Sequence, residues 1–196
     1  MNIKVRTPDG KQVSLADATL PIGRTLRIAP AFTAVATAAD ISVETTIHVA
    51  YSPDFGRYRI AASGHQIVGP DGEITPSVLR RIRLGELLAA AVPYCVAVSD
   101  DELGHGIVRD LVGASGRLLP KWMADTAAHA GPTRDTLELV QLAYGVAALA
   151  GQPPMQAVAA ELGIPTRTAT HWIARARQAG LLEGITYTAG RQPKGS

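Results

Sequence analysis

The clearest alternation of apolar and polar positions lies between residues 41 and 51. Every second residue from Ile41 to Tyr51 is apolar or β-branched, and the residues between them are mostly polar. A period of two is typical of a strand with one buried face. Residues 52–56 are turn formers, and residues 57–60 alternate again. The pattern therefore predicts a β-hairpin.

A helical period replaces the alternation after residue 74. Thr75 can cap a helix, and the fixed φ of Pro76 suits the first turn. Val78, Leu79 and Ile82 then have the spacing of an inner helix face. We expect the helical pattern to continue to Pro93, with short strands and turns at 3–29, a loop or short helix at 100–116 and a helix at 118–130.

The C-terminal third begins with a breaker pair, Gly131-Pro132, which predicts a domain boundary. Thr133 follows and can cap a helix whose first turn carries acidic residues, favourable beside the helix dipole. The apolar positions of this helix share one face: Leu137, Val140, Tyr144 and Ala147. Gly151 and Pro153-Pro154 end the pattern.

Two shorter helices are predicted on either side of Gly163. The first runs from Met155 to Leu162. A glycine just past a helix end accepts the left-handed conformation of a sharp turn. The second runs from Pro165 to Ala179, and we expect the Thr166 hydroxyl to bond to a free amide at its start. Its predicted core residues have helical spacing: Ala169, Trp172, Ile173 and Ala176.

Two helices that cross at a small residue and are joined by a glycine turn form the arrangement of a helix-turn-helix. Ala159, Gly163, Ile164, Ala169 and Trp172 have the spacing found in bacterial helix-turn-helix DNA-binding proteins. The run AVAAELGIPTRTATHWIARARQAGLL resembles segments of actinobacterial regulators and of phage or mobile-element proteins. Alanine-rich helices around a glycine also occur in helical bundles that bind no DNA.

The resemblance implies that the helix from Pro165 enters the major groove of double-stranded DNA. Arg167 is the best candidate for two hydrogen bonds to a guanine, and His171 for one. Arg175 and Arg177 are expected to reach phosphates. The outward face of the helix has no acidic residue, unlike an ordinary solvated face. The predicted DNA-binding residues are Gln156, Thr166, Arg167, Thr168, Thr170, His171, Arg175 and Arg177.

The charge distribution agrees with this placement. The chain has 196 residues and a formal net charge of +2, too small for wholesale binding of nucleic acid. Residues 1–131 contain thirteen basic and thirteen acidic residues, so the excess of positive charge lies in the C-terminal part. The positive end of the chain therefore coincides with the helix-turn-helix.

Residue patterns for catalysis and metal binding are weak. The five histidines stand singly, and the sequence has no HExxH, GxSxG or phosphate-binding glycine loop. The acidic run at 99–102 could hold a cation but is more typical of a solvated loop. Cys95 lies alone in an apolar run and is expected to be a buried hydrophobe. The sequence thus predicts no enzyme, no metal site and no cofactor.

Segments for export or membrane insertion are not evident. The first ten residues lack a signal-peptide core, and no apolar run approaches the roughly 20 residues of a membrane span. A cytoplasmic protein is expected.

The sequence as a whole predicts an α+β fold in three parts. A β-rich domain with helices occupies residues 1–131, a three-helix helix-turn-helix domain 132–184, and a flexible basic tail 185–196, with a short strand at 185–188. The expected function is a transcriptional regulator that binds double-stranded DNA. A homodimer through the N-terminal domain is expected, because one helix-turn-helix offers few phosphate contacts.

Three alternatives stay open. The N-terminal domain could also bind a small-molecule ligand. The C-terminal helices could bind a protein instead of DNA, as in an antitoxin-like or phage regulatory adaptor. An enzyme in residues 1–131 could be tethered to DNA by those helices.

Overall fold

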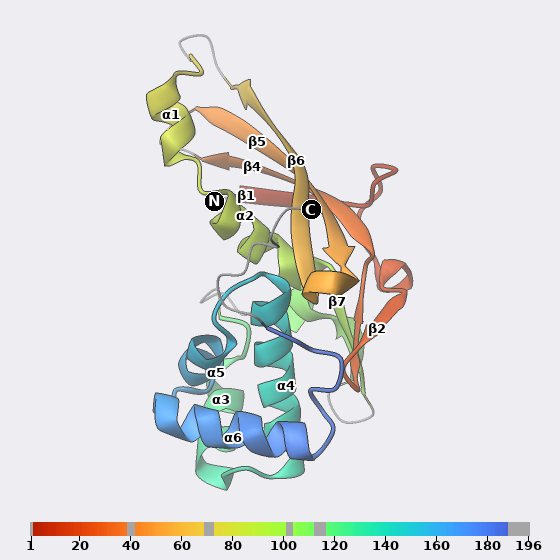
Figure 1. Cartoon of the computed structure of the whole chain (residues 1–196), viewed down its shortest axis with the longest axis vertical. Coiled ribbons are helices and arrows are strands. Elements are labelled where there is room, and N and C mark those ends of the chain that lie inside the picture. The colour runs from red at the N-terminus through yellow and green to blue at the C-terminus, as the bar shows by residue number, and fades with distance from the viewer. Residues whose placement is uncertain (1, 39–41, 69–72, 101–103, 112–116, 188–196) are drawn as a thin grey trace.

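A computed structural model describes residues 2–38, 42–68, 73–100, 104–111 and 117–187. Two antiparallel four-stranded sheets are built by the N-terminal part, and the longer helices follow toward the C-terminus. This confirms the predicted α+β class. Figure 1 shows the larger sheet at one end of the molecule and α6 at the other. No helix of the described residues is long and apolar enough to cross a membrane.

The larger sheet has the order β1-β4-β5-β6. Its strands are β1 (Asn2–Arg6), β4 (Ala31–Ala38), β5 (Val43–Ser52) and β6 (Arg57–Ile67). The predicted hairpin is confirmed, because β5 and β6 pair antiparallel across the 3-10 turn η2 (Pro53–Phe55). Gly56 closes this turn at a φ of 61°. Ile41, in the predicted strand, lies outside the described residues.

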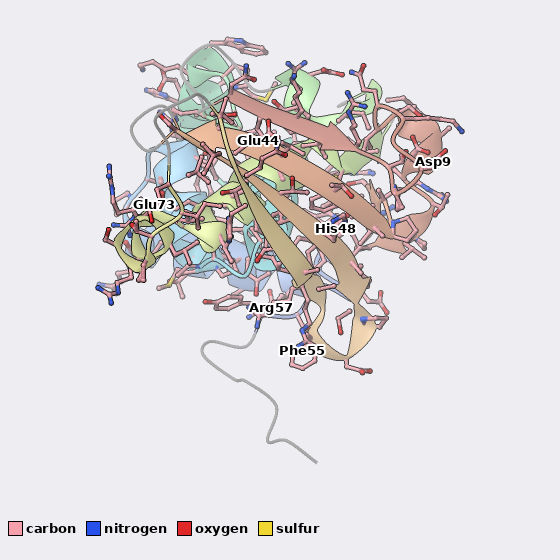
Figure 2. All side chains as sticks on the ribbon, turned by 90° about the horizontal axis from the view of Figure 1, so that it is seen from above. Asp9, Glu44, His48, Phe55, Arg57 and Glu73 are labelled. Atoms are coloured by element: carbon pink, nitrogen blue, oxygen red, sulfur yellow. The ribbon has the colours of Figure 1, made fainter. Side chains whose placement is uncertain are left out.

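The two faces of this sheet differ as the alternation predicts. Val43, Ile47 and Val49 of β5 are buried, whereas Glu44 and His48 lie on the other face. Figure 2 looks onto that outer face and shows the helices behind the sheet. The buried face continues into the protein core.

The aromatic residues of the larger sheet pack at its inner face. Phe32 meets Tyr58 edge to face, with ring centroids 5.0 Å apart. The Tyr58 hydroxyl donates to the Ala29 carbonyl at 2.7 Å, which satisfies a buried donor.

The smaller sheet has the order β2-β3-β7-β8. Its strands are β2 (Leu20–Ile22), β3 (Leu26–Ile28), β7 (Val96–Asp100) and β8 (Gly104–Ile107). The loop or helix predicted from residue 100 is therefore wrong at β8, although a short 3-10 turn, η4 (Val108–Leu111), follows. These short strands carry little periodicity of their own. Their formation depends on pairing of β7 with β3, which is distant in sequence.

The connection between the sheets contains α1 (Pro76–Arg81), α2 (Leu84–Ala91) and the 3-10 turn η3 (Val92–Tyr94). The predicted cap is confirmed, because Thr75 Oγ1 accepts from the Val78 amide at 3.2 Å. The predicted inner face of α1 is wrong: Val78 and Ile82 are only half-buried, and Leu79 is 41% exposed. Extended backbone at Ile82 ends this helix early, and α2 supplies the buried side chains instead.

The C-terminal part consists of α3 (Lys121–Ala130), α4 (Arg134–Leu149), α5 (Pro154–Leu162) and α6 (Thr166–Gln178). The predicted cap of α4 is present, since the Thr136 amide donates to Thr133 Oγ1. Nearly every residue of α4 is buried. This helix packs against both α5 and α6.

The hydrophobic core continues across the predicted boundary at Gly131-Pro132. One buried cluster contains residues of both sheets and of α4, α5 and α6. Thr25 donates to Gln141 Oε1 at 3.1 Å in a buried contact between the β2–β3 turn and α4. The two predicted domains therefore share one core.

The last described residues belong to this core as well. Ile185 is 4% exposed, and residues 185–187 form no strand, so the strand predicted there is wrong in its described part. A Cβ at Gly23 or at Gly145 would contact the Ile185 side chain. Ile185 is therefore held by packing against these two glycines and not by pairing with another strand. Residues 188–196 of the predicted tail lie outside the described part.

Gly145→Ala tests the close contact between α4 and β3. A Cβ at Gly145 would lie 2.7 Å from Leu26 Cδ1 inside the core, whereas Gly85 in α2 has open space. Both changes improve helix propensity, but only Gly145→Ala overpacks the core. We expect Gly145→Ala to be less stable than Gly85→Ala by about 1–3 kcal/mol in urea unfolding. Equal stabilities would show that Leu26 moves aside freely.

Candidate nucleic-acid interface

The turn between α5 and α6 is built by Gly163. This residue has φ 64° and ψ 30°, the left-handed conformation expected from the sequence. The Ile164 amide donates to the Ala159 carbonyl at 3.1 Å, which closes the end of α5. Pro165 then precedes the first residue of α6. The backbone thus reverses within a few residues, and Ile164 points partly into the core.

The inward face of α6 is the one predicted. Ala169, Trp172, Ile173 and Ala176 are each at most 5% exposed. They contact a core that includes Val158 and Leu162 of α5, while Ala159 is half-buried. This packing fixes which side of α6 faces solvent.

The outward face of α6 carries most of the predicted DNA-binding residues. No acidic residue occurs in α6. Thr168 is half-buried, and the other predicted residues of this helix are exposed: Thr166, Arg167, Thr170, His171, Arg175 and Arg177.

The start of α6 differs from the prediction in one respect. The N-cap residue is Pro165, and no side chain caps the helix, so the predicted Thr166 cap is wrong. Thr166 already stands inside the first turn, where its carbonyl accepts from Thr170 Oγ1 at 2.9 Å. The first backbone amides of α6 therefore receive no hydrogen bond from the side chain of the N-cap residue. Such amides, at the positive end of a helix dipole, favour an anion.

The first turn of α5 lies beside this face. Thr170 Oγ1 is 3.1 Å from Met155 Sδ, which connects α6 to the start of α5. Met155 is 40% exposed, and its neighbour Gln156 is also exposed. The contact brings Gln156 to the neighbourhood of the α6 residues.

The two arginines in the last turn of α6 have different surroundings. Arg177 Nη2 donates to the Tyr144 hydroxyl at 2.8 Å, and its guanidinium lies 5.5 Å from that ring centroid. Arg177 is thus held against α4, although its side chain is exposed. Arg175 makes no side-chain hydrogen bond or ion pair within the described residues. The role of Tyr144 as a partner of α6 has no signal in the sequence beyond its place on a helix face.

A side chain from before α3 fixes the end of α5. Arg117 Nη2 donates to the carbonyls of Ala160 and Glu161, both at 2.6 Å. In return, Glu161 Oε2 accepts from the Leu119 amide at 3.0 Å. A cation at the C-terminal carbonyls of a helix is favourable beside the dipole. Sequence reasoning missed this contact because its partners are far apart along the chain.

The remaining titratable groups form no comparable site. His48 and His65 lie 3.2 Å from the hydroxyls of Thr33 and Thr45 on neighbouring strands. No three His, Cys, Asp or Glu residues of the described chain gather around a possible metal position. Of the acidic run predicted as a loop, residues 101–102 lie outside the described part.

A hollow of about 680 Å³ lies between the α2–η3 segment and helices α4 and α5. Its volume is in the range of small-molecule sites. Arg109, at its rim, bonds to Asp110 at 3.3 Å and lies over the Tyr94 ring at 5.2 Å. Glu161 is bonded as well. These charged groups already have partners within the chain. They therefore do not indicate which kind of ligand the hollow would bind.

Arg117→Ala tests the contact that fixes α5. The change removes two hydrogen bonds from a cation to helix-end carbonyls, so we expect a loss of about 1–2 kcal/mol in urea unfolding, discounted for the partial exposure. The matched control is Arg24→Ala, since Arg24 is exposed and makes no side-chain hydrogen bond or ion pair within the described residues. Equal stabilities of the two variants would contradict the role of Arg117.

Cys95 is expected to be unreactive in the folded chain. It is fully buried, and burial raises the pKa of its thiol, so the reactive thiolate is scarce at pH 8. Alkylation by iodoacetamide should be at least roughly tenfold slower in the native chain than in urea. Equal rates would contradict the burial of this residue.

Comparison of the chain with protein-family models, with curated proteins and with solved structures finds no match. The comparisons therefore assign no family. The exposed face of α6 and the contacts that hold this helix in place remain as the guide to function.

Proposed function

We propose that this chain binds double-stranded DNA in a sequence-directed manner, as a cytoplasmic transcriptional regulator, through a helix-turn-helix formed by α5 and α6. The observation that carries the proposal is the exposed N-terminal half of α6, which has no acidic residue. A helix of this kind fits the major groove of B-form DNA.

Arg167 and His171 are the residues proposed to contact base edges. They are four positions apart in α6, so they share one face of the helix. Both are exposed. An arginine at the start of such a helix reaches the two acceptors of a guanine, and an imidazole reaches one. The short side chain of Thr170 between them allows close approach to the groove.

Phosphate contacts would surround this centre. The open amides at the start of α6, together with Thr166 and Thr168, suit a phosphate. Gln156 of α5 suits a neighbouring one. Arg175 is exposed near the far end of α6, and Arg177 has further donors besides the one bound to Tyr144.

The orientation of α6 is set before any ligand binds. Gly163 fixes the turn, Arg117 holds the end of α5, and the core face of α6 is buried. A preformed helix loses little conformational entropy on binding.

The two alternative functions would be recognised by different observations. A protein-binding adaptor would show no salt-dependent affinity for DNA. A tethered enzyme would need a catalytic centre in residues 1–131.

Arg167→Ala and Arg175→Ala separate base contact from phosphate contact. We expect Arg167→Ala to weaken binding to the preferred site by about 1–3 kcal/mol and to relax its specificity. Arg175→Ala should weaken all duplexes alike and reduce the slope of log affinity against log salt by about one. Fluorescence anisotropy at two salt concentrations measures both, with the preferred site first selected from random duplexes.

Arg80→Ala is the matched control for these variants. It removes the same charge from α1, which lies at the opposite end of the molecule from α6 (Figure 1). This change should leave the affinity nearly unaltered. Equal effects of all three substitutions on specific and random DNA would refute the assigned roles, and no enrichment of any sequence would refute sequence-directed binding.

A further inference from the structure

Within the described residues, the outer edge of β6 has no partner strand. β6 is the last strand in the order β1-β4-β5-β6 and pairs only with β5. Residues 61–64 of this strand are all exposed. No backbone hydrogen bond in the described part of the chain joins the outer edge of this stretch to another segment. A row of free amides and carbonyls of this kind can accept a further strand.

This edge has little of the protection that edge strands usually carry. The register shift between His48 and Val49 leaves Ala61 as an extra residue in β6, after which pairing from Ala62 to Ile67 is regular. Residues 62–67, ASGHQI, contain no proline and no Lys, Arg, Asp or Glu. Arg59, the nearest lysine or arginine along the chain, has its guanidinium 4.6 Å from the Phe55 ring centroid of its own hairpin. The edge is therefore open to pairing.

Exposed apolar side chains lie at the same end of the sheet. Val68, which follows β6, is 47% exposed, Ile74 38% and Leu79 of α1 41%. Figure 1 shows α1 at the end of the molecule where β6 terminates. Exposed large apolar residues at this end of the sheet suit a protein interface.

The sequence of this edge is complementary to itself. Antiparallel alignment of two copies about Gly64 places Ala62 opposite Gln66 and Ser63 opposite His65. No like charges meet, and the small side chains allow close approach. The alignment also brings the apolar end of each β6 alongside the first half of the other, where Ile60 is half-buried. The sequence of this edge thus permits pairing with a second copy of the chain.

We propose that two copies of this chain associate through antiparallel pairing of their β6 strands about Gly64, which joins the two larger sheets into one. This pairing deepens the proposed function and rests on it. A single helix-turn-helix offers few DNA contacts, and the pairing would supply a second one. The pairing itself needs no DNA and is measured without it.

The first test introduces charges at positions 62 and 66, which would face each other across the pairing. Ala62 and Gln66 lie on the outer face beside His48 and Glu44, and Ala62 and Gln66 are exposed. A62K/Q66K places like charges opposite each other twice, whereas A62E/Q66K places opposite charges there. Sedimentation equilibrium of the full chain should give a dimer dissociation constant roughly tenfold higher for A62K/Q66K than for A62E/Q66K, with the gap closing in high salt.

The second test locates the two-fold axis. Gly64 has open space for a side chain, so Gly64→Cys should fold and cross-link rapidly to itself across the axis under oxidising conditions. Ala62→Cys should cross-link much more slowly, because its counterpart lies several residues away along the strand. Ala16→Cys, at another exposed position, is the control, and the buried Cys95 is common to all three.

Both measurements can overturn the proposal. A monomer at all concentrations would do so, as would a dimer with equal dissociation constants in the two charge variants and no preferred cross-link in β6. A dimer of the predicted kind that binds no DNA would support the pairing and refute the proposed function, so the two failures are distinguishable.

Discussion

Burial of α4 is the constraint on which the rest of the molecule depends. This helix contacts α5 and α6, and it also meets the sheets through Gly145 against Leu26 and through Gln141 bonded to Thr25. A Cβ at position 145 would lie 2.7 Å from Leu26 Cδ1, so a larger residue there would overpack the contact with β3. The closeness of this contact allows one hydrophobic core to extend from the sheets to α6. The fold is therefore organised around a helix that is buried along most of its length.

The placement of α6 follows from this central helix. Its apolar face packs into the common core, its last turn is held by Tyr144 of α4, and the preceding helix is held by Arg117 from before α3. Each contact acts on a different part of the two-helix unit. Together they leave only one face of α6 in solvent, the face without acidic residues. The proposed interface is thus a consequence of packing on the opposite side.

Features that depend on nearby residues could be predicted from the sequence. The caps at Thr75 and Thr133, the left-handed Gly163, the β5–β6 hairpin and the inward face of α6 are of this kind, because partners a few positions apart determine them. The prediction failed where distant partners decide. Strand β7 pairs with the distant β3, and Arg117 bonds to the end of α5. Periodicity indicates a buried Leu79, but the described residues leave it 41% exposed. The predicted Thr166 cap is absent because the N-cap position falls one residue earlier, at Pro165, which has no side-chain acceptor.

The shared core also bears on how such a chain can evolve. Helix-turn-helix units that fold independently can be exchanged between proteins as cassettes by recombination. Here Leu26 and Thr25 of the N-terminal part fit Gly145 and Gln141 of α4, and Ile185 closes the same contact from the C-terminal side. A foreign C-terminal unit would have to match this surface. Changes in the sheets and in α4 should therefore arise as compensating pairs, and the two parts should be inherited together.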